Sequence, residues 1–240
     1  VYKRQVRGWS HHDSADLYGI DDWGNGYFRI SKKGEVTVRL NDEDGGKKDI
    51  SLCDLLEGLN ERGTTVPVLF RFRDLLRSRI AELNESFRKA IKEADYQGHY
   101  QGVYPIKVNQ QRQVVEEIAE YGTKYDYGLE AGSKPELIAA MAHMHNPNAY
   151  LICNGYKDDE FIDLALTAQK MGLNIFIVLE MPSELDAIFA RAKKMDIRPN
   201  LGLRVKLAAK GSGLWHESAG DKSVFGLNAA QVLDLSLIHI

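Results

Sequence analysis

Apolar residues from position 66 onward alternate between short continuous runs and segments in which they recur at helical spacing. Short continuous runs are typical of strands that are buried on both faces. Recurrence every three or four residues is typical of helices with one buried face. Strands are therefore predicted at Val66–Phe70, Gly102–Val108, Tyr125–Glu130, Ala149–Asn154, Asn174–Glu180 and Asn200–Leu207, and helices at Arg73–Ala94, Gln110–Tyr121, Pro135–His145, Glu160–Met171 and Glu184–Met195.

The ends of the helical segments carry residues that commonly begin and end helices. Ser133–Glu136 and Ser183–Asp186 each fit a capping box, in which a serine and an acid satisfy the first backbone N–H groups. Gly122 and Gly172 stand where two helices are expected to end. These boundaries support a regular alternation of strands and helices, with a repeat of about two dozen residues after the first, longer helix.

This alternation predicts the fold class. Strands that alternate with helices form parallel β/α units, and a (β/α)8 barrel built from such units needs ~250 residues. Residues 64–234 supply six predicted strands, so we expect an α/β fold with a partial (β/α)8 (TIM-type) barrel. A doubly wound open sheet is the alternative, although no GxGxxG fingerprint follows the first predicted strand.

The first part of the chain, residues 1–63, has a different pattern and is expected to form an N-terminal segment. Tyr27–Ile30 and Glu35–Leu40 are β-favouring runs on either side of a short polar turn, which predicts a β-hairpin. Asn41–Lys48 is polar and is expected to be a loop. Ser51 is placed to cap a short helix whose leucines share one face.

Both ends of the sequence are unusual. The chain begins at Val1 rather than at a methionine, and residues 235–240 read Leu-Ser-Leu-Ile-His-Ile. This hexapeptide resembles the translation of an adapter used in sequencing libraries, and an ordinary apolar helix end is the alternative. On the adapter interpretation, the chain is a piece of a longer gene.

Composition narrows the class of protein. A hydrophobic content of 44% and a charged content of 27% are typical of a globular protein, and the net charge of −3 gives no reason to expect nucleic acid or an anionic membrane as a partner. No apolar run approaches the ~20 residues that a membrane helix needs, and the first residues are not a secretory signal. Cys53 and Cys153 have neither metal-ligand nor redox spacing and suit a reducing cytosol, so a cytoplasmic location is expected.

Polar residues at the ends of the apolar runs are the candidates for chemistry, because barrel enzymes place their reacting groups at the carboxyl ends of strands. Each also has a structural explanation: the lysine can extend from a strand end into water, and the others can cap helices, form turns or pair on the rim. Together, a lysine, an acid and an arginine on one face suggest an anionic ligand with a carbonyl group. The residues are Lys107, Asn109, Glu130, Asn154, Glu180 and Arg204.

Pyridoxal phosphate fits that ligand. A lysine attacks its aldehyde only as a neutral amine, and the ordinary lysine pKa is about 10.4, which burial and a neighbouring cation lower. The cofactor ring then withdraws electrons from the α-carbon of an amino acid, which allows the loss of carbon dioxide. We therefore expect Lys107 to lie inside the mouth of the barrel and to carry the cofactor as a Schiff base.

Four segments point to a known family: Tyr18–Phe28, Val103–Gln110, Gly128–Leu137 and Ile152–Asp158. In these segments the sequence resembles the barrel-type pyridoxal-phosphate decarboxylases, and among them the biosynthetic arginine decarboxylases. The similarity runs from about Tyr18 to Leu233. One departure is Val224, which stands where relatives commonly carry lysine.

The resemblance implies roles for three residues: Lys107 would be the catalytic lysine that binds pyridoxal 5'-phosphate, and Glu130 and Arg204 would lie beside the cofactor. It also implies conversion of L-arginine to agmatine and carbon dioxide in polyamine and spermidine biosynthesis, with Mg²⁺ alongside the cofactor and a homo-oligomeric full-length protein. Residues 1–63 would join a second, β-rich domain. The groups that stack on the ring, bind its phosphate and bind the substrate guanidinium would lie beyond Ile240, so the 240 residues alone are expected to be inactive.

Two alternatives stay open from the sequence. One is a decarboxylase for another basic amino acid, namely lysine, ornithine or diaminopimelate. The other is a non-catalytic, cofactor-binding regulatory barrel, against which the retention of Lys107 argues. The histidines, including His143 and His216, show no metal-ligand pattern, so no metal ligand is predicted.

Overall fold

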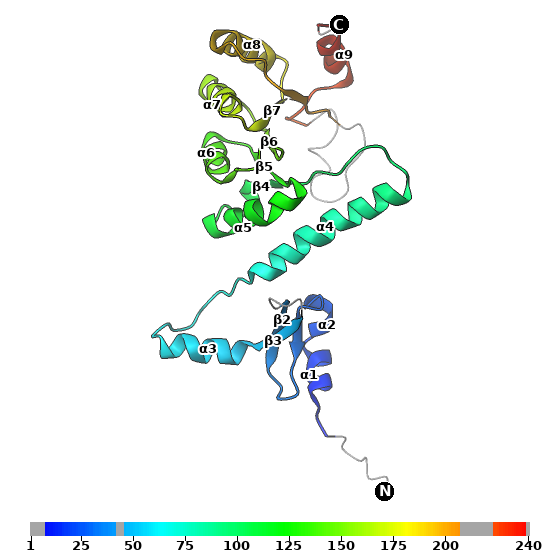
Figure 1. The fold of residues 1–240 in the computed structure, drawn as a ribbon, viewed down its shortest axis with the longest axis vertical. Helices are drawn as coiled ribbons and strands as arrows, with labels where there is room; N and C mark the ends of the chain where they lie inside the picture. The colour runs from blue at the N-terminus through cyan, green and yellow to red at the C-terminus, as the bar shows by residue number, and fades with distance from the viewer. Residues whose placement is uncertain (1–7, 42–45, 207–222, 239–240) are drawn as a thin grey trace. The chain divides into compact units, whose positions relative to one another are not determined.

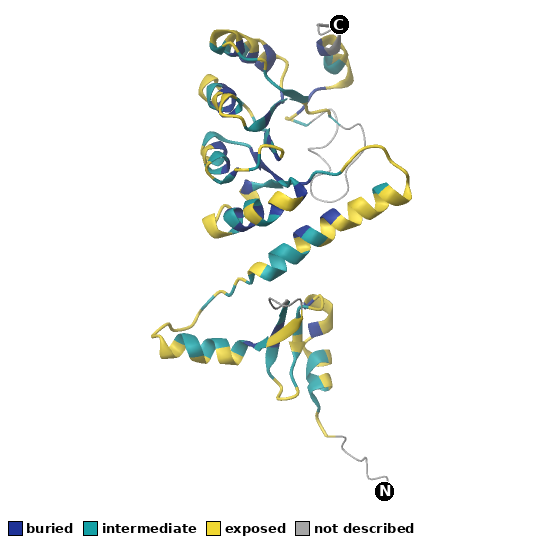
Figure 2. Ribbon diagram, viewed as in Figure 1, coloured by how far each residue is buried: buried dark blue, intermediate teal, exposed yellow. Residues whose placement is uncertain are grey.

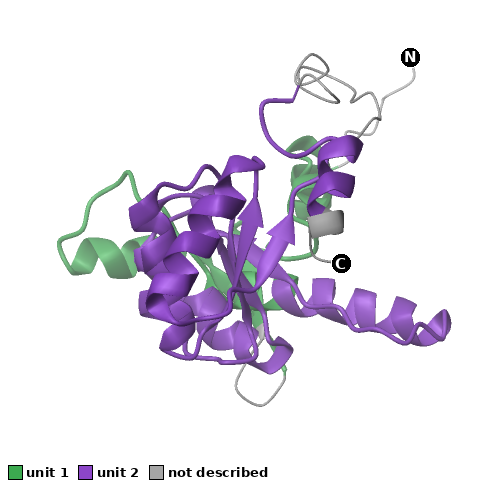
Figure 3. Ribbon diagram, turned by 90° about the horizontal axis from the view of Figure 1, so that it is seen from above, with its two compact units in different colours: residues 1–79 green, residues 80–240 purple. Residues whose placement is uncertain are grey.

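The computed structural model describes residues 8–41, 46–206 and 223–238. The chain divides into two compact units, Val1–Arg79 and Ile80–Ile240, coloured separately in Figure 3. The division falls inside the long helix α4 (Arg73–Glu93), and the domain boundary expected after residue 63 stays a prediction. Within the described residues, the helices are too short or too polar to span a membrane.

The first unit contains a three-stranded antiparallel sheet in the order β1-β2-β3. In this sheet Phe28 pairs with Val38, which confirms the predicted hairpin. The loop expected at Asn41–Lys48 is too long, because the third strand already begins at Lys47. This strand is a sheet edge, where charged side chains face water and Arg39 pairs with Asp49 at 2.7 Å. The strands are β1 (Phe28–Ile30), β2 (Val36–Asn41) and β3 (Lys47–Ser51).

Three helices belong to this unit: α1 (His11–Leu17), α2 (Ile20–Trp23) and α3 (Leu52–Glu61). The Ser51 hydroxyl accepts hydrogen bonds from the backbone N–H groups of Cys53 and Asp54, which confirms the predicted start of α3. Helix α1 was not predicted. Ser10 and Asp13 form a capping box at its start, a local signal that the sequence does contain.

The second unit is a parallel sheet of five strands in the order β4-β5-β6-β7-β8, and the partial barrel of the α/β class is confirmed. Consecutive strands pair, and Figure 1 shows the intervening helices along one face of the sheet. The strands are β4 (Val103–Pro105), β5 (Gly128–Ala131), β6 (Tyr150–Cys153), β7 (Asn174–Leu179) and β8 (Leu201–Leu203). The helices are α5 (Arg112–Gly122), α6 (Lys134–His143), α7 (Asp159–Lys170), α8 (Ser183–Met195) and α9 (Ala229–Ile238), with 3-10 turns η1 (Ile106–Val108) and η2 (Thr123–Tyr125).

Two local predictions are wrong. Val66–Phe70 forms no strand, so the described sheet has five strands rather than six; Val66 is 69% exposed and Leu69 76%, and Pro67 has no N–H to donate to a sheet. Ser183 does not cap α8 through a capping box, because that helix follows Pro182 without a side-chain cap.

The two faces of the parallel sheet differ in burial, as the alternation of half-buried and buried residues along β7 shows. Figure 2 colours the chain by burial. Ile175, Ile177 and Leu179 are fully buried on the face that packs against the helices. Phe176 and Val178 point to the other face and are half-buried. Val178, on this second face, lines the pocket described below, which lies at the carboxyl ends of the strands.

Gly128 fixes the approach of two strands beside that pocket. A Cβ atom at this position would lie 2.0 Å from the backbone oxygen of Tyr150, and a backbone atom cannot move aside as a flexible side chain can. The absence of a side chain therefore lets β5 and β6 pair closely, with Glu130 opposite Ile152.

Candidate active site

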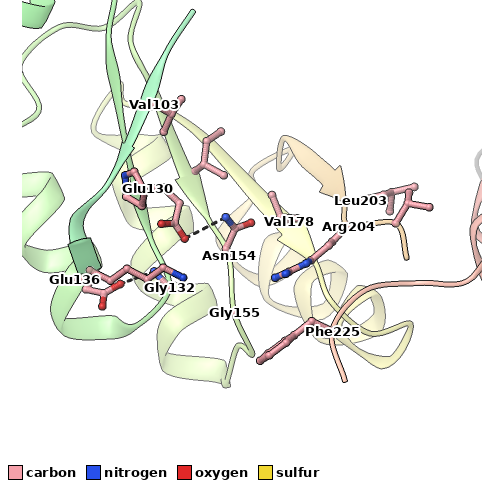
Figure 4. Close-up of a pocket in the computed structure, with 14 residues that line it drawn as sticks. Val103, Glu130, Gly132, Glu136, Asn154, Gly155, Val178, Leu203, Arg204 and Phe225 are labelled. Atoms are coloured by element: carbon pink, nitrogen blue, oxygen red, sulfur yellow. Dashed lines mark hydrogen bonds between the residues drawn. The ribbon is translucent and has the colours of Figure 1, made fainter. Parts of the chain in front are cut away.

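A cavity of about 870 Å³ lies at the carboxyl ends of the five parallel strands. It brings together Lys107, Glu130 and Arg204, which come from the ends of β4, β5 and β8, and Figure 4 shows the last two with their neighbours. Parallel strands end at the same edge of a sheet, which is why three residues far apart in the sequence meet here. The lining residues are Val103, Pro105, Lys107, Glu130, Gly132, Glu136, Ile152, Asn154, Gly155, Val178, Leu203, Arg204, Val205 and Phe225.

Lys107 lies in the 3-10 turn η1, directly after β4. The buried side chain of Ile106 anchors this turn, and Lys107 lines the cavity while remaining exposed. Lys107 is thus present at the cavity where it is expected, but as an exposed rather than a buried residue, two positions after the sheet pairing ends at Pro105. Asn109 does not cap α5, because the N-cap of that helix is Gln111, without a side-chain hydrogen bond. Its side-chain oxygen instead accepts a hydrogen bond from the Gln111 N–H at 3.1 Å, in the turn before the helix.

Glu130 is the buried acid of the cavity. It is 9% exposed, and its Oε1 accepts a hydrogen bond from Asn154 Nδ2 at 3.1 Å, drawn in Figure 4. Its other oxygen, Oε2, is buried and has no hydrogen-bond partner among the described residues. Buried polar atoms are almost always paired, so this oxygen is where a donor group of a ligand would bind.

Arg204 follows β8, and its guanidinium has two neighbours. Its NH1 donates a hydrogen bond to Glu180 Oε1 at 3.1 Å, and the guanidinium carbon lies 5.2 Å from the centre of the Phe225 ring. Glu180 is buried, whereas the Arg204 side chain is 48% exposed. The strand-end arginine thus pairs with the acid of the adjacent strand rather than with Glu130.

The sequence analysis did not predict a buried ion pair, between Lys157 and Glu184, that lies behind the lining residues Gly155 and Val178. The side chain of Lys157 is fully buried; its Nζ donates hydrogen bonds to the carbonyl oxygens of Gly155 (2.6 Å) and Val178 and lies 3.7 Å from Glu184 Oε2. Burial lowers the pKa of Lys157 below its ordinary value, against the opposing charges of Glu184 and Glu180. Lys157 stands in a loop without periodicity, and its place in a segment shared with the resembled family was the one signal available.

Cys153 ends β6 and is fully buried, whereas Cys53 is exposed. Burial, with a further contribution from the charge of Glu130, raises the pKa of the Cys153 thiol to about 12, although Lys157 opposes this. At pH 8 we therefore expect Ellman's reagent to modify Cys53 rapidly and Cys153 only after unfolding. A Cys53→Ser variant should lose the fast phase, and rapid modification of Cys153 in the folded variant would contradict the expectation.

The remaining candidates do not extend the cavity. The Val224 side chain is exposed and outside the lining, and its backbone oxygen accepts a hydrogen bond from the Tyr156 hydroxyl at 3.0 Å. The departure at this position therefore leaves the described lining unchanged. His216 lies outside the described residues, and His143 lies in the last turn of α6. In the described part of the chain, no three His, Cys, Asp or Glu residues gather as metal ligands.

Comparison with known proteins gives relatives over nearly the whole chain. A biosynthetic arginine decarboxylase of Gloeobacter violaceus is 49% identical over 230 residues, which are 96% of this chain and 35% of the relative. One from Aeromonas hydrophila is 47% identical and covers 96% of this chain and 36% of its own. The chain thus spans about a third of the length of these curated relatives.

Solved structures agree. The crystal structure of the biosynthetic arginine decarboxylase of Campylobacter jejuni is 37% identical, with a TM-score of 0.79 over 92% of this chain and 35% of that one. A diaminopimelate decarboxylase from M. jannaschi, 19% identical with a TM-score of 0.66 over 90% of this chain and 44% of its own, shows the shared fold. The family described as "Pyridoxal-dependent decarboxylase, pyridoxal binding domain" matches residues 78–238. This match covers most of the chain, which therefore belongs to the pyridoxal-dependent decarboxylase family.

Proposed function

We propose that the chain is part of a pyridoxal-phosphate-dependent arginine decarboxylase, which converts L-arginine to agmatine and carbon dioxide. The observation that carries the proposal is the meeting of Lys107, Glu130 and Arg204 in one cavity at the carboxyl ends of the strands. The choice of arginine rests on the names of the relatives that are 37% to 49% identical.

The residues of the cavity fit pyridoxal phosphate chemically. Lys107 supplies an amine for covalent attachment, Arg204 a cation for an anionic cofactor, and Glu130 a buried oxygen that is free to accept a hydrogen bond. When bound, the cofactor supplies an electron-withdrawing ring that takes up the electron pair left by the departing carboxylate. Around it, the apolar side chains of Ile152 and Val178 exclude water and strengthen the electrostatic contacts.

Further assignments belong to this proposal. Residues 64–234 form the cofactor-binding barrel, and residues 1–63, with their three-stranded sheet, belong to a second, β-rich domain. The enzyme serves polyamine and spermidine biosynthesis in the cytoplasm, and its full-length form is a homo-oligomer. Magnesium accompanies the cofactor, but the described residues offer no cluster to which it could be assigned.

The test is carbon dioxide release from carboxyl-labelled amino acids by the gene product that carries these residues, saturated with pyridoxal phosphate. We expect release from L-arginine at least about 100-fold faster than from L-lysine, L-ornithine or diaminopimelate. Faster release from one of the other three would overturn the assignment of arginine. Cofactor binding without release from any of the four would favour a regulatory barrel instead.

A further inference from the structure

We propose that Glu180 is a positioning residue, which fixes the guanidinium of Arg204 at the edge of the cavity. The inference deepens the proposed function and rests on it, because Arg204 is there assigned to the cofactor. Glu180 does not line the cavity, so its contribution passes through the arginine. Neither sequence motifs nor the cavity lining alone distinguishes Glu180 from an ordinary rim acid.

The register of the sheet places the two residues side by side. Strands β7 and β8 pair in parallel with Leu179 opposite Leu203, so the next residues, Glu180 and Arg204, leave the sheet together. The Arg204 N–H donates a hydrogen bond to the Leu179 oxygen at 3.1 Å, which continues the pairing by one step. The guanidinium then contacts the Glu180 carboxylate at 3.1 Å. Hydrogen bonds between charged groups are stronger than neutral ones, so this contact restricts the arginine.

Further hydrogen bonds hold Glu180 itself in place. Its Oε1 also accepts a hydrogen bond from the Gly155 N–H at 2.9 Å, and the Glu180 N–H donates to Glu184 Oε2 at 2.7 Å. Glu184 accepts a second bond, from the Lys157 N–H at 3.0 Å, and its carboxylate lies beside the buried Lys157 amine. The two acids Glu184 and Glu180 thus lie between two cations, Lys157 and Arg204, and of these four residues only Arg204 lines the cavity. A buried, anchored carboxylate can orient its partner without moving itself.

A second set of contacts also confines Arg204. Phe225 lies against the guanidinium, and Tyr156 stacks on Phe225 with ring centres 5.0 Å apart. The Leu227 N–H donates a hydrogen bond to the Arg204 oxygen at 2.7 Å. At Gly226 a Cβ atom would lie 3.3 Å from Arg204 Cγ, so this segment runs directly against the arginine stem. Because both Glu180 and Phe225 contact it, the guanidinium is restricted before any ligand arrives.

The test compares the 240-residue chain with its Glu180→Gln variant, which keeps the shape of the side chain and removes the charge. The first readout is the rate at which phenylglyoxal modifies Arg204 without cofactor, followed by mass spectrometry of the Arg204 peptide. The second is the Kd for pyridoxal phosphate, measured from visible absorbance. The matched control is Asp163→Asn. It removes the charge from the 2.8 Å ion pair between Asp163 on α7 and Arg191 on α8, which lies outside the cavity.

We expect Glu180→Gln to speed the modification of Arg204 about three- to tenfold, because a guanidinium that is no longer held by a carboxylate is more accessible to the reagent. The Kd for pyridoxal phosphate should rise by a similar factor, and Asp163→Asn should change neither value. An unchanged rate at Arg204 would overturn the inference. A faster rate with an unchanged Kd would leave the positioning intact and overturn the assignment of Arg204 to the cofactor.

A second pair of variants covers the case in which Glu180→Gln does not fold, as judged by circular dichroism. Glu180→Asp keeps the charge but shortens the side chain, and Phe225→Leu removes the ring that contacts the Arg204 guanidinium. Each is expected to speed the modification of Arg204 by about two- to fivefold. Unchanged rates in both would overturn the inference.

Discussion

Replacing Lys107 with methionine is expected to abolish covalent capture of pyridoxal phosphate by the chain. Lys107 is the lysine of the described cavity lining, and methionine keeps much of its length without an amine. The chain is incubated with the cofactor, reduced with borohydride and digested, and the phosphopyridoxyl group on the Lys107 peptide is quantified by mass spectrometry. We expect the label on the variant to fall about 100-fold or more.

The control for this experiment is Lys170→Met, which removes an exposed lysine on α7 whose amine donates to the Met195 oxygen at 2.9 Å. It should retain full labelling of Lys107. Equal labelling of several surface lysines in the parent chain, with no preference for Lys107, would count against the cofactor assignment. That outcome leaves the contact between Glu180 and Arg204 unaffected, because phenylglyoxal reports on it without cofactor.

Replacing Lys157 with methionine is expected to destabilise the second unit by about 3–5 kcal/mol, because it leaves the buried charge of Glu184 without its partner. The free energy of unfolding is measured by urea titration, followed by far-ultraviolet circular dichroism. The double variant Lys157→Met/Glu184→Gln removes both charges, so it should recover a large part of that loss. The carbonyl oxygens of Gly155 and Val178 lose their donor in both variants, which limits the recovery.

Lys134→Met is the matched control, because Lys134 also pairs with two acids, Asp158 and Glu160 at 2.7 and 2.8 Å, but at the surface. Exposed pairs contribute less than about 1 kcal/mol, so this variant should be nearly as stable as the parent. If Lys157→Met costs no more than Lys134→Met, the pair with Glu184 is not the buried, coupled contact that the geometry indicates.

The repeating part of the fold was predictable because each β/α unit carries its own signal. The strand predicted at Asn174–Glu180 is found at Asn174–Leu179, and its helix, predicted at Glu184–Met195, at Ser183–Met195. The prediction was wrong where strand formation depends on the presence of a second strand to pair with. Val66–Phe70 is apolar enough for a strand but pairs with none, and the charged strand β3 exists because β2 lies beside it.

The sequence predicted where the residues of the candidate site lie, but not which of them form ion pairs with one another. Lys107, Glu130 and Arg204 each follow an apolar run, and parallel strands carry such residues to one edge. Which acid pairs with Arg204 depends on strand register and side-chain rotamers, which no linear pattern contains. The burial of Lys157 was equally hidden, because a lysine between Tyr156 and Asp158, in a segment without periodicity, is typical of a surface loop.

The absence of a side chain at Gly128 has a consequence for how this protein tolerates change. Any larger residue at Gly128 would push the Tyr150 backbone away from β5. This shift would move Asn154, which follows β6, relative to Glu130, which lies two residues after Gly128 on β5. In a saturation mutagenesis experiment scored only by activity, Gly128 would therefore rank with the residues that line the cavity, although no substrate could touch it. The set of positions at which substitution lowers activity should therefore be larger than the set of residues that line the cavity.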